Sequence, residues 1–271
     1  MVKRVLTHLA LLTGAAVMLA PFILMLSISL KPPGEVFSPH FALLPTQWYA
    51  VENYTAAFTK VPLLRFLLNG LFVTLCIFAA QALTALPMAY ALAKLRWRGR
   101  EAAFAMVVLA LLIPPQVPAI PLYIALWQLG LLNTYAAIIL PSTISVFGIF
   151  LMRQFFRTVP DDLIAAARMD GLSEWAIVWR IMLPTAAPAI AAFACLSFIW
   201  NWNEFFWPLI AVQEEHLMTP PLGIAFFSNA EAGTSFGPLM AAATVVTAPL
   251  ALAFLLAQRA FIEGVTMTGV K

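Results

Sequence analysis

The sequence predicts an all-α membrane protein with six transmembrane helices in a single domain, residues 1–271. Its mean hydropathy is +0.93 and only 10% of its residues are charged, which is typical of membrane proteins with several spans rather than of soluble domains. Six apolar stretches reach the length of roughly 20 residues that a bilayer core requires. Because backbone groups in lipid must pair within their own segment, each stretch is expected to be helical. The predicted spans are residues 9–30, 67–93, 103–127, 135–156, 186–210 and 237–260.

The Lys and Arg residues predict the orientation of these spans. With a cytoplasmic N-terminus, all but three of the 15 Lys and Arg residues lie on the cytoplasmic side, and the exceptions are Lys31, Lys60 and Arg65. The outer loop at 213–236 contains acidic residues but no Lys or Arg. Cytoplasmic loops are enriched in these basic residues. Both termini and the loop at about 158–184 are therefore predicted to be cytoplasmic.

The first apolar stretch resembles a signal peptide in one respect, since Lys3 and Arg4 precede it. Its core is long for that role, and no small-residue cleavage site precedes Lys31, so we expect a retained span. The outer segment at 31–66 contains four prolines and a glycine before residue 46. This composition predicts an extended loop with little regular structure.

The third stretch contains an unusual cluster of prolines. Four of them lie within residues 113–121, and Pro118 is among them. A proline inside a helix costs about 3 kcal/mol, and the carbonyls that it frees must be covered by protein or water inside a bilayer. A packing kink and a bend that lines a pathway both fit this pattern. Either interpretation places the span inside the bundle or at a subunit contact.

The chain lacks the residues that several classes of function require. No Gly-x-x-x-x-Gly-Lys-Ser/Thr sequence is present, so no phosphate-binding loop of that type is expected. Cys76 and Cys195 lie in apolar runs and the three histidines are scattered, which argues against a disulfide framework or a metal site. The basic residues are distributed according to the side of the membrane and do not form a patch, so nucleic acid is not an expected partner. The chain is expected to be non-catalytic and to bind no cofactor.

The loop at about 158–184 has an internal design of its own. Asp161 is a candidate N-cap, and Asp162 is favoured by the positive end of the helix dipole. The alanines at 165–167 favour helix and allow close approach by another protein. Gly171 permits the helix to end in a reversal. Ser173 can then cap a second helix over 174–182, which is expected to stop at Pro184.

This loop resembles the cytoplasmic EAA loop of ABC importer permeases, whose pattern is Glu-Ala-Ala, three residues, Gly, nine residues, Ile, one residue, Leu-Pro. The residues in register are Ala166, Ala167, Gly171, Ile181, Leu183 and Pro184. The leading Glu of the pattern is Ala165 here. An amphipathic loop lying on the membrane surface is the alternative, but it would not explain the spacing. The resemblance implies the type I permease fold with cytoplasmic coupling helices that fit a groove on a separate ATPase. The candidate coupling residues are Asp161, Asp162, Ala165, Ala166, Ala167, Asp170, Gly171, Ile181, Leu183 and Pro184.

Three other segments indicate which branch of the ABC importer permeases this chain resembles. Residues 131–134, 200–209 and 261–271 are similar to the smaller membrane subunit of maltose-type importers. This branch implies a bacterial inner-membrane complex with a second permease, two ATPase subunits that hold ATP and Mg²⁺, and a periplasmic or lipid-anchored solute-binding protein. The implied solute is a sugar or a sugar-like molecule, with a glycerophosphate or a polyol as alternatives. An autonomous secondary transporter is a further alternative, although the spans show no midplane acid or obvious repeat.

The outer end of the fifth span supplies the candidates for a solute pathway. Asn201 and Glu204 are polar residues in a helix rich in Phe, Trp and Ala, where an unpaired polar group is costly. Their spacing places them on one helical face, while Asn203 is rotated away and is expected to pair with a neighbouring helix. A structural or interfacial role fits the same residues. Together with Pro118 they form the predicted pathway set.

Overall fold

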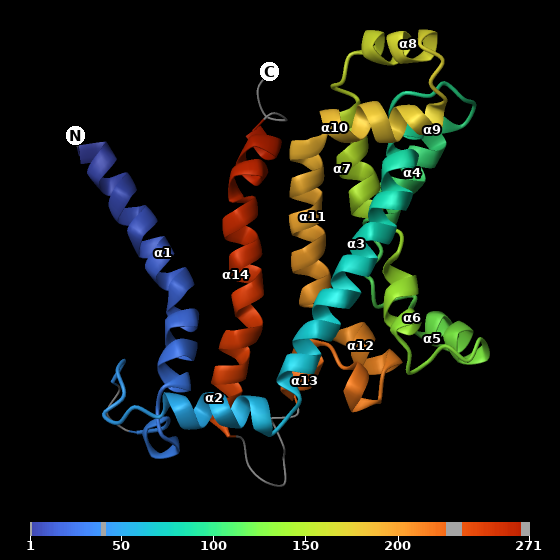
Figure 1. Cartoon of the computed structure of the whole chain (residues 1–271). Coiled ribbons are helices and arrows are strands. Elements are labelled where there is room, and N and C mark those ends of the chain that lie inside the picture. Colours follow the sequence, from blue (N-terminus) through green and yellow to red (C-terminus); the bar gives the residue numbers. More distant parts are fainter. Residues whose placement is uncertain (1, 39–41, 226–234, 267–271) are drawn as a thin grey trace. The chain divides into compact units, whose positions relative to one another are not determined.

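The computed structural model describes residues 2–38, 42–225 and 235–266, and over these ranges the chain consists of helices and connecting turns without a β-strand (Figure 1). The predicted all-α fold is confirmed. The chain divides into two compact units, the first formed by residues 1–67 and 220–249 and the second by residues 68–219 and 250–271.

Three helical segments of the described chain are long and apolar enough to cross a membrane: Arg4–Ser29, Leu63–Ala93 and Phe236–Leu255. Two bent helix pairs raise the number to five if each pair is one span. The predicted third span is interrupted: α4 (Arg100–Ala110) and α5 (Ala119–Gln128) are separated by turns at the proline cluster. The predicted break in the helix is therefore present, and the number of six spans stays a prediction.

The first unit contains α1 (Val2–Ser29), η1 (Pro33–Glu35), α2 (Ala50–Thr59), α13 (Pro220–Ile224) and the first parts of α3 (Leu63–Ala93) and α14 (Phe236–Thr266). The expectation of an extended loop over 31–66 is wrong, because α2 forms within it. Asn53 and Ala57, one turn apart, are buried on its inner face. The Asn53 amide donates to the carbonyls of Ser29 and Lys31, at 3.0 and 2.9 Å. Carbonyls at the end of α1, which lack partners within that helix, are thereby satisfied.

The second unit contains most of α3 and the remaining elements. These are α4, α5, α6 (Tyr135–Ile139), η2 (Leu140–Ser142), α7 (Val146–Phe156), α8 (Asp161–Met169), α9 (Glu174–Ile177), η3 (Val178–Met182), α10 (Leu183–Thr185), α11 (Ala187–Trp202), α12 (Phe206–Ala211), η4 (Glu215–Leu217) and the end of α14. A continuous core joins α3, α7 and α11, and it includes Leu86, Met152 and Phe193. The same core extends to Ile164 of α8 and Ile177 of α9. The bundle and the segment after α7 are therefore packed as one body within this unit.

The fourth predicted span is broken as well, with a bend of 40° between Tyr135–Ser142 and Val146–Phe156. Pro141 lies at the break, and the carbonyls of Ser142 and Thr143 are left without helical partners. Side chains of α3 satisfy both: the Gln81 amide donates to Ser142 and the Thr84 hydroxyl donates to Thr143, each at 2.9 Å. A break at membrane depth persists only when such partners are present.

Candidate functional site: the hairpin after α7

The hairpin consists of residues 158–185, and its first arm is α8. Pro160 occupies the N-cap position with extended backbone, and both acids of the first helical turn follow it. The predicted N-cap role of Asp161 is wrong, because this residue is already helical and its carboxylate binds Lys94 instead. Asp162 is exposed in the same turn, where the helix dipole favours a negative charge.

The reversal at Gly171 is confirmed. This glycine has a φ of +78°, and its N–H donates to the carbonyl of Arg168 at 3.0 Å. The N–H of Leu172 donates to the carbonyl of Ala167 at 3.1 Å, which completes the hydrogen-bond pattern of a helix that ends in a left-handed residue. Asp170, which precedes the glycine, is exposed. The turn is built by local hydrogen bonds and requires a residue that tolerates a positive φ.

The second arm runs through α9, the π-helical segment η3 and α10. The predicted Ser173 cap is confirmed, since its hydroxyl accepts from the N–H of Ala176 at 3.3 Å. The predicted end of this helix is wrong: the helix was expected over 174–182, but α10 continues directly from η3 through Pro184 and ends at Thr185. The chain then bends by 87° into α11. Ile181 and Leu183 are half-buried and pack against the core.

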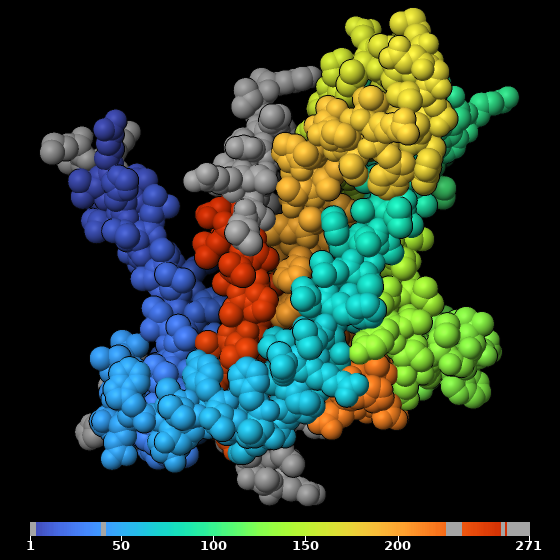
Figure 2. Space-filling model, viewed as in Figure 1, coloured from blue at the N-terminus to red at the C-terminus, as the bar shows by residue number. Residues whose placement is uncertain are grey.

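The first arm has an inward and an outward face. Ile164 and Ala167 are buried in the core, with 2% and 5% of their surface exposed. The outward face follows the helical spacing i, i+3, i+4, i+7. It consists of Asp162, Ala165, Ala166 and Met169. Met169 is 83% exposed, although it is apolar. In the space-filling view the yellow atoms of this arm form the outermost layer at one end of the second unit (Figure 2).

This arrangement corrects one detail of the prediction. Three consecutive alanines cannot all face a partner, because successive helical residues are rotated by about 100°. Ala165 and Ala166 are exposed, whereas Ala167 packs inside. The outward face thus combines two small residues with a flexible apolar side chain and an acid. Such a surface is suited to close contact with another protein.

Polar side chains at the end of α3 bind this hairpin, and most of these contacts were not predicted from the sequence. Lys94 Nζ donates to Asp161 Oδ1 and to the carbonyl of Val159, both at 2.5 Å. This hydrogen bond and the lysine charge hold the pKa of Asp161 below its usual range. Tyr90 Oη donates to Glu174 Oε2 at 2.5 Å. The spacing of Tyr90 and Lys94, four residues apart at the end of a predicted span, is the only sequence signal for this pair.

The two arms are also joined to each other. Arg168 Nε donates to Glu174 Oε1 at 2.8 Å, and Arg168 Nη2 donates to Glu174 Oε2 at 3.2 Å. This two-point contact with a carboxylate raises the pKa of Arg168. It spans the Gly171 turn, so the end of the first arm and the start of the second are held together.

The residues predicted for a solute pathway lie on three separate segments. The Asn201 amide is buried and donates to the carbonyl and hydroxyl oxygens of Ser197, at 2.8 and 3.1 Å. Ser197 in turn donates to Gln81 Oε1 at 2.7 Å, so Asn201 belongs to the polar network at the break of the fourth span. Pro118 is exposed at the N-cap of α5.

Two expectations at the end of α11 are wrong. Asn201 and Glu204 do not share a helical face, because α11 ends at Trp202 and Glu204 lies in the turn that follows. Its carboxylate accepts the N–H of Trp207 in the first turn of α12, at 3.0 Å, and so satisfies a donor that lacks a partner within the helix. The Asn203 amide donates to the carbonyl of Ile199 in its own helix, at 2.8 Å, and not to a neighbouring helix.

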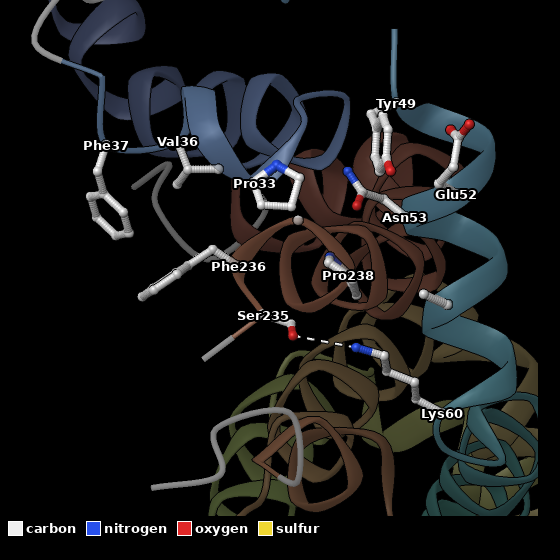
Figure 3. A pocket seen from close by; sticks show the side chains of 12 residues that line it. Pro33, Val36, Phe37, Tyr49, Glu52, Asn53, Lys60, Ser235, Phe236 and Pro238 are labelled. Carbon is white, nitrogen blue, oxygen red and sulfur yellow. Dashed lines mark hydrogen bonds between the residues drawn. The ribbon is translucent and has the colours of Figure 1, made fainter. Parts of the chain in front are cut away.

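The first unit contains a pocket of about 460 Å³ (Figure 3). Its walls are α2 and the start of α14, with η1 at one side. Lys60 Nζ lies 3.3 Å from Ser235 Oγ across the opening. The wall contains three aromatic residues, Phe37, Tyr49 and Phe236, together with polar and charged side chains. The lining residues are Pro33, Val36, Phe37, Tyr49, Glu52, Asn53, Ala56, Lys60, Ser235, Phe236, Gly237 and Pro238.

A comparison with known families decides the class of protein. Residues 81–266, which include the hairpin, match the family described as the binding-protein-dependent transport system inner membrane component. The chain belongs to this family. It is therefore an inner-membrane permease component, and the predicted membership in the binding-protein-dependent importer permeases is confirmed.

Curated relatives match nearly the whole permease. The arabinooligosaccharides transport system permease protein AraQ of Halalkalibacterium halodurans is 31% identical over 253 residues, which cover 93% of this chain and 90% of AraQ. The sn-glycerol-3-phosphate transport system permease protein UgpE of Brucella abortus is 30% identical over 275 residues, which cover 98% of this chain and 97% of UgpE.

Solved structures share the fold. A chain of a bacterial ABC transporter involved in the import of the acidic polysaccharide alginate matches with a TM-score of 0.83 and 24% identity, covering 95% of this permease and 96% of that chain. A chain of the alginate transporter in complex with an alginate pentasaccharide-bound periplasmic protein matches with a TM-score of 0.62 and 17% identity. The match covers 98% of this permease and 96% of that chain. The permease therefore has the ABC importer permease fold.

Proposed function

We propose that this permease forms one half of the solute pathway of an ATP-driven importer for a sugar or a sugar-like solute. The observation that carries the proposal is the hairpin, whose exposed face of small and apolar residues is rigidly held at one end of the bundle. Relatives named for arabino-oligosaccharides and for sn-glycerol-3-phosphate support a polyhydroxylated solute. A glycerophosphate or a polyol is the second candidate for the solute.

The hairpin docks on a separate ATPase in this proposal. ATP and Mg²⁺ bind to that partner, and this chain contributes no catalytic group. The coupling residues are those predicted from the sequence, with Ala165 and Ala166 at the contact and Gly171, Ile181, Leu183 and Pro184 shaping the hairpin. Because Lys94 holds Asp161, the exposed Asp162 is the acid of the first turn that faces the ATPase in place of the family Glu.

The proposed topology has six spans in one permease domain with both termini in the cytoplasm. Its third span is the broken pair α4 and α5, its fourth span is the bent pair Tyr135–Ser142 and Val146–Phe156, and its fifth span begins with α11, after the hairpin. The distribution of Lys and Arg supports this orientation. The pocket at α2 then faces outward, where we propose that it contacts a periplasmic or lipid-anchored solute-binding protein. A second permease completes the pathway.

Reconstitution of the complete importer in proteoliposomes tests this function, with candidate sugars and glycerophosphates supplied on the loaded binding protein. We expect ATP-dependent solute uptake, and we propose that Pro118, Asn201 and Glu204 line the pathway. Asn201→Ala and Glu204→Ala should therefore lower uptake several-fold with little change in basal ATP hydrolysis, and Asn203→Ala, which alters an exposed residue, serves as the control. Unchanged kinetics in both variants would contradict the pathway assignment. Uptake that is driven by an ion gradient without ATP would instead indicate a secondary transporter.

A further inference from the structure

The last turn of α3 and the residue after it carry two polar side chains that reach the hairpin. Tyr90 and Lys94 are four residues apart and therefore lie on one face. Lys94 bonds the start of the first arm at Asp161, and Tyr90 bonds the start of the second arm at Glu174. The hairpin is thus attached at two points to α3, whose bonding residues lie 67 and 84 positions earlier in the sequence than their partners.

These contacts form a closed ring. Glu174 accepts from Tyr90 and from Arg168, and Arg168 lies at the end of the arm that Asp161 begins. The Lys94 side chain is 6% exposed, and its second bond, to the carbonyl of Val159, fixes the linker between α7 and α8. The Asp161 side chain is 81% exposed, so Lys94 is the buried partner of this ion pair, and its two bonds supply the partners that a buried ammonium group requires.

The end of α3 is tied to α7 as well. Buried Arg153 of α7 donates from Nε to the carbonyl of Leu92 at 3.2 Å, and its guanidinium lies 3.4 Å from the centre of the Phe104 ring. Tyr90, Leu92 and Lys94 therefore connect three elements at one place: α7, the first arm and the second arm.

The covalent connections of the hairpin are less restrictive. A turn over residues 157–159 joins α8 to α7, and an 87° bend after Thr185 joins the second arm to α11. Turns and bends of this kind are where large changes in backbone angles are absorbed. Beyond these two connections, the hairpin is held by the apolar packing of Ile164 and Ile177 in the core and by the directional bonds of Tyr90 and Lys94.

We propose that Tyr90 and Lys94 are positioning residues that fasten the hairpin to α3, so that a displacement of the hairpin by its partner is transmitted to α3 directly. This role rests on the proposed function of the hairpin as the docking element. It assigns the transmission of movement to a helix that is not adjacent to the hairpin in the sequence.

The test uses Lys94→Met, which keeps an apolar stem, and Tyr90→Phe, which removes only the hydroxyl, alone and combined. A nitroxide label at position 166, on the exposed face, reports hairpin motion in the full chain in nanodiscs. We expect a clearly more mobile label in the double variant, rescue by Lys94→Arg, and no change with Arg98→Met, an exposed basic residue of the same loop.

In the reconstituted importer, the double variant should import at least fivefold less solute per ATP hydrolysed than the wild type, with the complex still assembled. Label mobility equal to that of the wild type, or an unchanged ratio of solute to ATP, would overturn the positioning role. A wild-type importer without ATP-dependent uptake would overturn the proposed function itself and this role with it, which distinguishes the two failures.

Discussion

Replacing Gly171 with valine is expected to abolish solute import while the chain still inserts into the membrane. The backbone φ of +78° at this position disfavours any residue with a Cβ, and a β-branched residue most of all. A strained backbone of this kind costs about 1–3 kcal/mol, which the turn can relieve by changing the angle between the two arms. The measurement is uptake and ATP hydrolysis in the complete importer.

Different substitutions at this position are expected to lower solute import to different degrees. No atom lies within 4 Å of a Cβ placed at Gly171, so the effect of a substitution comes from the backbone and not from a clash. Asn tolerates the left-handed region, so Gly171→Asn should retain most of the import activity. Gly34→Val, at a glycine with equally open surroundings and no positive φ, should behave as the wild type. Normal import by Gly171→Val would contradict the importance of this turn.

Gly148→Ala is expected to weaken the packing of α7 against α11. A Cβ at this position would lie 2.3 Å from the ring of Phe193, which is 1% exposed and cannot move aside. Overpacking of a core costs about 1–3 kcal/mol. We expect the unfolding temperature of the purified chain to fall by several degrees, measured by its intrinsic fluorescence on heating.

The matched control is Gly14→Ala, because no atom lies within 4 Å of a Cβ at Gly14. The double variant Gly148→Ala with Phe193→Leu should recover part of the lost stability, since the smaller side chain makes room for the methyl group. An unfolding temperature for Gly148→Ala equal to that of the wild type would show that the two helices are not packed as closely as described.

The hairpin was predictable where local rules decide its structure. The Gly171 reversal and the Ser173 cap each depend on a few consecutive residues, and both are confirmed. The inward position of Ala167 depends on how the helix packs, and spacing alone did not indicate it. The bond between Lys94 and Asp161 joins residues far apart in the sequence, so only the fold reveals it.

The same distinction applies to the rest of the fold. The proline cluster near Pro118 predicted an interrupted helix correctly, because proline acts locally. The break after Ser142 was not predicted, since it persists through Gln81 and Thr84 of another helix. Helix α2 was not predicted either, for a related reason. Its residue Asn53 donates to carbonyls at the end of α1, and this contact, which holds α2 in place, joins residues more than 20 positions apart in the sequence.

Cysteine cross-linking at adjacent positions of the hairpin tests most directly whether its outward face docks on an ATPase. Ala166 is exposed on that face, whereas Ala167 is 5% exposed and packs in the core. With a short bifunctional reagent and cysteines in the groove of the partner ATPase, Ala166→Cys should cross-link efficiently and Ala167→Cys should not. The yield at position 166 should change when ATP is added. Cross-linking at position 167 but not at 166, or at neither position in an importer that transports its solute, would contradict docking through this face.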